Sequence, residues 1–204
     1  MITIINYGLG NVRAFVNVYE RLNIPVSVAN TATDLKSASK IIFPGVSTFD
    51  YAMQLLQKSG MRETLNKLVL QNKIPVLGIC VGMQMMAHSS EEGNLQGLGW
   101  IDGIVKKINI SETSTKIRLP HMGWNNVEII RNSKLLQNID NKSRFYFLHS
   151  YYFHCHNKKD IIALTDYGHP FPCAINSENI YGVQFHPEKS HKNGIEVLKN
   201  FANL

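Results

Sequence analysis

The sequence of 204 residues contains few cysteines, no long hydrophobic run and no dense block of charge of one sign. Its three cysteines, Cys80, Cys155 and Cys173, are an odd number without metal-ligand spacing, which argues against a disulfide framework and a zinc site. No stretch approaches the roughly 18 apolar residues of a membrane-spanning helix. The start "MITIINYGLG" lacks the basic leader of a signal peptide. We therefore expect a reduced, cytoplasmic protein without a metal and without membrane contact.

The basic residues are in moderate excess and are scattered along the chain. The formal net charge is +6, but there is no lysine- or arginine-rich run and no nucleic-acid-binding motif. We expect no nucleic-acid partner. The charge instead indicates a solvated surface, or a local patch for an anionic substrate or an acidic partner.

Segments typical of strands and helices alternate through the first half of the chain. Apolar runs predict strands over 2–6, 24–29, 40–45 and 74–80, and helical spacing predicts helices over 12–22, 48–60, 61–73 and 82–90, with Thr48 as a cap. The second half is richer in strands, expected over 104–110, 126–130, 145–148, 161–165, 173–175 and 180–185, before a helix over 194–204. Such alternation is typical of a parallel sheet covered by helices on both faces. We predict a single α/β domain over 1–204, with an open mixed, mainly parallel sheet flanked by helices.

The turn "YGLGN" begins like a dinucleotide-binding fingerprint. Gly8 and Gly10 fit its first two glycines, but Arg13 occupies the third position, and no acidic residue follows a second strand at the expected distance. The segment therefore predicts a tight strand-to-helix turn, and no cofactor is expected.

Cys80 stands between two glycines, in "GICVG", after an apolar strand and before a helix. This is the layout of a nucleophile elbow with sulfur in place of oxygen. Small neighbours let the backbone turn sharply, and the start of the helix favours a thiolate. It also directs the N–H of Val81 towards any oxyanion that forms. A buried structural cysteine is the alternative, and the elbow by itself does not decide between the two.

A cysteine nucleophile needs a base, and the base needs an orienting group. Among eight histidines, His186 stands out in "YGVQFHPEKS", because it follows an apolar strand and Glu188 lies two residues on. Residues i and i+2 of extended backbone point the same way, and Pro187 discourages a helix. Glu188 can therefore accept from Nδ1 of His186 and leave Nε2 for the thiol.

These two motifs together resemble the class I glutamine amidotransferases, whose glutaminases use a Cys-His-Glu triad. The resemblance implies that L-glutamine is hydrolysed through a γ-glutamyl thioester, with Cys80 as nucleophile, His186 as base and acid, and Glu188 as orienting group. "FPGVSTFD" looks like the family's oxyanion strand, and "LHSYY" like the segment that grips the amino-acid end of glutamine. By the same resemblance, Val46 and Val81 form the oxyanion hole, and the glutamine-binding residues are Gly45, Gln84, Ser150 and Tyr151.

The similarity extends over nearly the whole chain to one subfamily, the glutaminase subunits of imidazole glycerol phosphate synthases. "YGLGN", "LPHMGWN" and "HPEKS" carry it. The resemblance implies docking, as a heterodimer, on the face of a (β/α)8 barrel synthase subunit that receives the ammonia for histidine biosynthesis. The residues expected at this interface are Asn11, Met122, Trp124, Asn125, Tyr146 and Lys189. Trp124 as plain core and Lys189 as a solvated loop charge are the structural alternatives.

One position departs from the family pattern. The oxyanion strand commonly reads Pro-Gly-Val-Gly, and Ser47 takes the last place here. Serine disfavours positive φ and would hinder a backbone flip at Val46. We expect the oxyanion strand to be misaligned until the partner and its ligand bind, so that the isolated chain is a poor glutaminase.

Four other functions share part of this pattern. A paralogous glutaminase that supplies ammonia for amino or amidino sugars of surface polysaccharides has the same catalytic motifs and stays open. The glutaminase of pyridoxal phosphate synthesis should lack "MGWN" and "HPEKS". A non-catalytic protein with a degenerate glutaminase fold would not need the intact triad, and a cysteine protease would carry a different signature around Cys80.

Overall fold

The computed structural model describes residues 1–109 and 117–204. At its centre is an eight-stranded mixed sheet in the order β2-β1-β3-β4-β13-β12-β11-β8. The strands are β1 (Ile2–Ile5), β2 (Val26–Ala29), β3 (Lys40–Gly45), β4 (Val76–Cys80), β8 (Glu128–Ile129), β11 (Ile161–Asp166), β12 (Pro170–Ser177) and β13 (Ile180–Val183). The five strands from β2 to β13 run parallel, and β12, β11 and β8 are antiparallel to their neighbours. The predicted α/β fold is confirmed, with the antiparallel strands added at one edge.

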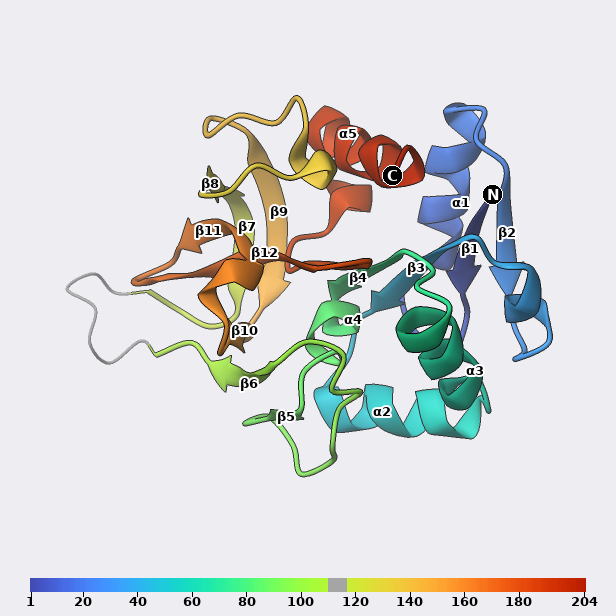
Figure 1. Ribbon diagram of the computed structural model, residues 1–204. Helices are drawn as coiled ribbons and strands as arrows, with labels where there is room; N and C mark the ends of the chain where they lie inside the picture. Colours follow the sequence, from blue (N-terminus) through green and yellow to red (C-terminus); the bar gives the residue numbers. More distant parts are fainter. Residues whose placement is uncertain (110–116) are drawn as a thin grey trace.

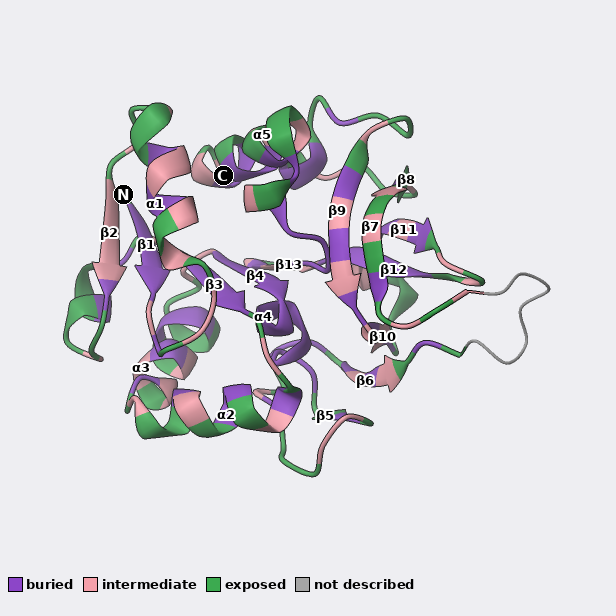
Figure 2. Ribbon diagram, turned by 180° about the vertical axis from the view of Figure 1, so that it is seen from behind, coloured by how far each residue is buried: buried purple, intermediate pink, exposed green. Residues whose placement is uncertain are grey.

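Helices lie on both faces of the parallel strands. Helices α1 (Val12–Arg21) and α5 (His191–Ala202) lie on one side, and α2 (Phe49–Lys58) and α3 (Arg62–Asn66) lie on the other (Figure 1). β1 and β4 are buried along their whole length, which explains why their sequences are continuous apolar runs without polar alternation. The buried residues gather in these central strands (Figure 2).

Three of the predicted helices differ from expectation at their ends. Thr48 precedes α2, but its side chain makes no capping hydrogen bond; instead the Glu92 carboxylate accepts from the N–H of Phe49 at 2.8 Å. The helix expected over 82–90 is only α4 (Val81–Gln84), and β5 (Ser89–Ser90) follows it. The helix expected over 61–73 continues from α3 into a π-helical turn, Lys67–Gln71.

Two smaller sheets complete the fold, and the sequence predicted them poorly. One contains β10 (Tyr151–Cys155), β6 (Gly103–Lys107) and β5, and the other pairs β7 (His121–Asn126) with β9 (Arg144–His149). β7 and β10 were not predicted, and the strand expected over 126–130 is divided between the end of β7 and β8. β7 contains glycine, tryptophan and two asparagines, so local propensity does not mark it, and pairing with β9 forms it. The expected strand over 104–110 corresponds to β6, and Ile110 lies outside the described residues.

The remaining helical segments are single 3-10 turns. They span Asp34–Ser37, Lys134–Leu136, Lys158–Asp160 and Pro187–Lys189. The last of these leads from the end of the sheet into α5. In the part of the chain that the structure describes, no helix has the length and hydrophobicity needed to cross a membrane.

Candidate active site

The turn between β4 and α4 places Cys80 at the carboxyl edge of the parallel strands. Cys80 has φ 54° and ψ −113°. Residues other than glycine rarely adopt this backbone conformation, which costs about 1–3 kcal/mol. Its neighbours must be glycine: a Cβ on Gly82 would lie 2.0 Å from the carbonyl oxygen of Phe43, and one on Gly78 would lie 2.8 Å from that of Gly82. The backbone on both sides of Cys80 is packed against neighbouring carbonyl oxygens, and the strained turn between them holds the thiol at the sheet edge.

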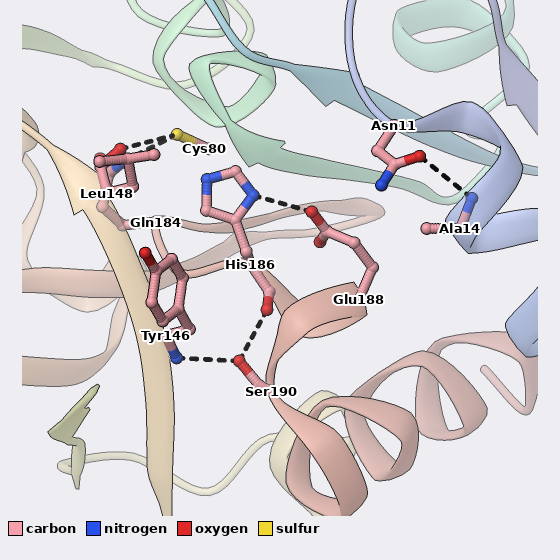
Figure 3. A network of polar contacts seen from close by, with 9 residues as sticks. All are labelled: Asn11, Ala14, Cys80, Tyr146, Leu148, Gln184, His186, Glu188 and Ser190. Atoms are coloured by element: carbon pink, nitrogen blue, oxygen red, sulfur yellow. Dashed lines mark hydrogen bonds and ion pairs between the residues drawn. The ribbon is translucent and has the colours of Figure 1, made fainter. Parts of the chain in front are cut away.

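His186 and Glu188 form a buried hydrogen-bonded pair beside this turn. Nδ1 of His186 lies 2.9 Å from Oε1 of Glu188, and both side chains are 2% exposed. Because a carboxylate only accepts, Nδ1 carries a proton, and Nε2 is turned towards Cys80 (Figure 3). Burial by itself lowers the pKa of His186, but hydrogen bonds and charge from Cys80 and Glu188 outweigh it and raise the pKa to about 10.

The backbone of His186 is attached to strand β9. Its N–H donates to the carbonyl oxygen of Tyr146 at 2.9 Å. The hydroxyl of Ser190 donates to the carbonyl oxygen of His186 at 2.6 Å and accepts from the N–H of Tyr146 at 2.9 Å (Figure 3). Ser190, for which the sequence suggested no role, thus fixes the turn that carries the histidine and the glutamate.

Two buried glutamines link the sulfur to the neighbouring strand. Nε2 of Gln184 donates to Sγ of Cys80 at 3.7 Å, and Nε2 of Gln84 donates to Oε1 of Gln184 at 3.0 Å. Nε2 of Gln84 also donates to the carbonyl oxygen of Tyr151 at 2.8 Å. Gln184 was not predicted. The only signal for it was a polar residue inside the apolar run "GVQF".

A cavity of about 220 Å³ opens beside Cys80. This is below the roughly 300–1,000 Å³ of sites for drug-sized ligands and suits an amino acid. Its lining includes Cys80 and most of the residues predicted for the oxyanion hole and for glutamine, namely Val46, Val81, Gln84, Ser150 and Tyr151. Ser47, Glu92, Leu148 and His149 complete the lining. A larger hollow of about 690 Å³, beside α2, is lined by no cysteine, histidine or carboxylate.

Glu92 is a cavity residue that the sequence did not predict. Burial, and then the nearby charge of Asp50, raise its pKa, although the hydrogen bond from the N–H of Phe49 acts in the opposite sense. It belongs to no motif, and only folding brings it to the cavity. It places one carboxylate in a wall that is otherwise largely uncharged.

The expected oxyanion strand borders the same cavity. Gly45 pairs with Cys80 across β3 and β4, and Val46 and Ser47 follow it along the cavity wall. The non-glycine residues with positive φ in the described ranges do not include Val46 or Ser47. Both residues therefore have ordinary backbone conformations, as the serine favours.

Three of the predicted interface side chains meet at the surface. The ring of Trp124 stacks on His191, with centroids 5.1 Å apart, and contacts the edge of the Tyr146 ring. Nζ of Lys189 lies 5.6 Å from the centroid of the Tyr146 ring. We call Met122, Trp124, Tyr146, Lys189 and His191 the aromatic patch; Met122 is 64% and Trp124 38% exposed.

The other two predicted interface residues lie differently. Asn125 has its side chain on the opposite face of β7, where it donates to the carbonyl oxygen of Asp166 at 2.7 Å. Asn11 is exposed, and its side chain accepts from the N–H of Ala14 at the start of α1. Neither side chain joins the aromatic patch.

The described residues contain no group of three or more histidine, cysteine, aspartate or glutamate side chains that could hold a metal ion. Cys155 and Cys173 are buried. Burial, together with the charges of Asp160 and Asp102, raises the pKa of Cys155 to about 12, which suits a structural thiol and not a nucleophile.

Comparison with known proteins gives a consistent result. Residues 3–204 match the family model described as glutamine amidotransferase class-I. The chain is 53% identical, over 100% of both chains, to the imidazole glycerol phosphate synthase subunit HisH of Leptospira interrogans, and equally so to that of Bdellovibrio bacteriovorus. Its fold is similar to a crystal structure of a glutamine amidotransferase, with a TM-score of 0.77, full coverage of both chains and 16% identity. The chain therefore belongs to the class I glutamine amidotransferase family.

Proposed function

We propose that this chain is the glutaminase subunit of an imidazole glycerol phosphate synthase, acting over 1–204 as a single domain. The observation that carries the proposal is Nε2 of His186, turned towards Cys80 beside a cavity of amino-acid size. The full-length similarity to subunits of that name supports the choice of synthase.

Glutamine binds with its side-chain amide at Cys80. The Glu92 carboxylate is the cavity's partner for the α-ammonium group. The segment at Ser150 and Tyr151 forms the adjoining wall, which Gln84 braces through the Tyr151 carbonyl oxygen.

Catalysis proceeds in two halves. Because the pKa of His186 is raised to about 10, its Nε2 holds the proton of the Cys80 thiol near neutral pH, and the sulfur attacks the side-chain amide carbon of glutamine as a thiolate. His186 then returns the proton to the departing nitrogen, the C–N bond breaks, ammonia leaves and a γ-glutamyl thioester remains. In the second half His186 takes a proton from water, the hydroxide attacks the thioester, and the proton returns to sulfur as glutamate is released.

Glu188 holds the proton on Nδ1 of His186 throughout and stabilises the imidazolium that forms in each half. The N–H groups of Val81 and Val46 stabilise the tetrahedral oxyanion, and the loss of one such donor costs about 3–4 kcal/mol in comparable sites. Alignment of Val46 depends on the partner, so glutamine is not hydrolysed without an acceptor for the ammonia.

The partner is a (β/α)8 barrel synthase subunit that docks on the aromatic patch and receives ammonia through its interior. Exposed aromatic residues with a cation beside them are typical of interface centres. The ammonia is then used to form imidazole glycerol phosphate in histidine biosynthesis, in the cytoplasm.

The test uses this chain co-purified with its barrel subunit. We expect glutamine-dependent release of ammonia that Cys80→Ala abolishes, and labelling of Cys80 by a diazo-oxo-norleucine electrophile. Expression of the pair should restore growth of a histidine auxotroph that lacks this subunit. Failure of labelling in the presence of the partner would refute the glutaminase, and failure of growth alone would refute the pathway.

A further inference from the structure

Two buried histidines connect strand β7 with the wall of the glutamine cavity. Nε2 of His121 lies 3.3 Å from Nδ2 of Asn125, and Nδ1 of His121 lies 3.0 Å from Nε2 of His149. Nδ1 of His149 lies 2.9 Å from the carbonyl oxygen of Tyr151. The proposed mechanism uses neither histidine.

These hydrogen bonds form a relay from Asn125 through His121 and His149 to the Tyr151 carbonyl oxygen. The chemistry of the groups in the relay determines the direction of each of its hydrogen bonds. A carbonyl only accepts, so His149 carries its proton on Nδ1, and in the neutral ring its Nε2 must accept. His121 therefore donates from Nδ1 and accepts at Nε2, and Asn125 must present its amide N–H. The assignment of Asn125 agrees, because its Oδ1 accepts from the N–H of Asn126 at 2.8 Å.

Burial keeps both rings neutral, as this order requires. His121 is 3% and His149 6% exposed, and the ring of His121 is stacked between those of Phe147 and Tyr167, at 4.7 and 4.0 Å. Burial lowers the pKa of His121 to about 4. Burial, together with the charge of His121, lowers the pKa of His149 to about 3. Both histidines are thus fixed in the tautomer with the proton on Nδ1.

The two ends of this relay lie at functionally different places. At the inner end, the Tyr151 carbonyl oxygen accepts from both His149 and Gln84, and all three residues line the cavity beside Cys80. At the outer end, Asn125 belongs to β7, whose opposite face carries the exposed side chains of Met122 and Trp124.

We propose that His121 and His149 are positioning residues for glutamine binding: their directed hydrogen bonds hold the Tyr151 carbonyl, and with it Gln84, in register with strand β7. The identity of the ligand rests on the proposed function. The two rings touch no reacting atom. They act on the geometry of the cavity wall, so their loss raises KM for glutamine and spares kcat.

The first test reads the tautomers in the full chain, labelled with 15N-histidine. At pH 7 we expect the 15N shifts of both histidines to show a protonated Nδ1 and an unprotonated Nε2. His121→Phe and His149→Phe assign the signals by their loss. A proton on Nε2 of His149, or an imidazolium at either position, would overturn the relay.

The second test is steady-state glutamine hydrolysis by the complex with its partner. His121→Phe keeps the stacking on Phe147 and Tyr167, and His149→Phe removes the donor to Tyr151. Each is expected to raise KM about tenfold, the effect of an unmade hydrogen bond with a buried partner left unpaired, while kcat changes less than twofold. The control is His169→Phe. The His169 ring packs on Phe171 but makes no hydrogen bond among the described residues, so this variant should leave the KM for glutamine unchanged.

The outcomes separate the two proposals. An active wild-type complex with an unchanged KM in both variants overturns this inference alone. A wild-type complex that does not hydrolyse glutamine overturns the proposed function and this inference with it. A fall in kcat without a change in KM would also contradict a positioning role.

Discussion

Replacement of Glu188 by glutamine tests how much the buried carboxylate contributes to catalysis. The change keeps the size of the side chain and leaves one oxygen able to accept from Nδ1 of His186, at the 2.9 Å distance of the present bond. It removes only the negative charge beside the imidazolium that forms when His186 takes a proton. Both side chains are 2% exposed, so solvent cannot replace this charge.

The expected magnitude follows from the kind of hydrogen bond that is lost. A bond to a charged partner contributes about 1.5–3 kcal/mol, and a neutral one about 1 kcal/mol. The difference of roughly 1–2 kcal/mol corresponds to a fall in kcat of about 5- to 30-fold. If the amide instead turns its NH2 group towards Nδ1, the wrong tautomer forms and the loss approaches the roughly 10⁴-fold seen in the serine protease triad.

The assay is ammonia release by the complex, with kcat and KM measured between pH 6 and 10. Glu188 is one of the groups that raise the pKa of His186 to about 10, so removal of its charge should lower that pKa and move the alkaline limb of the rate profile towards neutrality. The control is Glu178→Gln, which removes a surface ion pair with Lys73 at 2.7 Å and should change neither quantity. A fall in kcat of less than twofold with an unmoved alkaline limb would refute the reasoning.

Three further predictions concern stability and assembly. The pKa of His149 is about 3 in the fold, below the ordinary value of roughly 6.5, so the unfolded chain binds the proton first as the pH falls. This residue should therefore lower the free energy of unfolding by roughly 2 kcal/mol between pH 8 and 5. Urea denaturation should find that this loss is absent in His149→Phe. Cys80→Gly and Cys80→Ala should both abolish glutaminase activity. The glycine variant should be more stable by about 1 kcal/mol in thermal or urea unfolding, because residue 80 has a φ of 54° that glycine adopts readily. An alanine variant of equal or higher stability would contradict a strained turn. Trp124→Ala should weaken binding of the barrel subunit at least tenfold by calorimetry, whereas Tyr51→Ala, which removes an exposed aromatic ring on α2, should leave the affinity unchanged; equal effects would argue against docking on the aromatic patch.

The sequence alone was sufficient for the α/β fold and for the principal strands and helices. Buried parallel strands such as β4 are continuous apolar runs, and glycines around Cys80 marked the sharp turn, so local chemistry carried the prediction. It failed at β7 and β10, where pairing partners and not intrinsic propensity form the strand. It also extended α4 too far, because the apolar residues after Gln84 are equally compatible with a helix.

The candidate site divides in the same way. Cys80, His186 and Glu188 were predicted because each motif is short. The i, i+2 spacing does bring the histidine and the glutamate together, but Glu188 lies in the 3-10 turn Pro187–Lys189 and not in the extended backbone that was expected after Pro187. Glu92, Gln184 and Ser190 were not predicted, since their partners lie on other segments of the chain.

The sequence by itself thus determined the local chemistry: a cysteine on a turn that only glycine neighbours permit, and a histidine with its own carboxylate. Tertiary structure decided which of these groups meet. The order and register of the strands place Gln184 at the sulfur, and bring Asn125, His121, His149 and Tyr151 into one directed chain of hydrogen bonds. The physical reason is that a hydrogen bond between distant segments needs its atoms placed to within a few tenths of an ångström. That placement comes from packing of the whole molecule, and no local pattern encodes it.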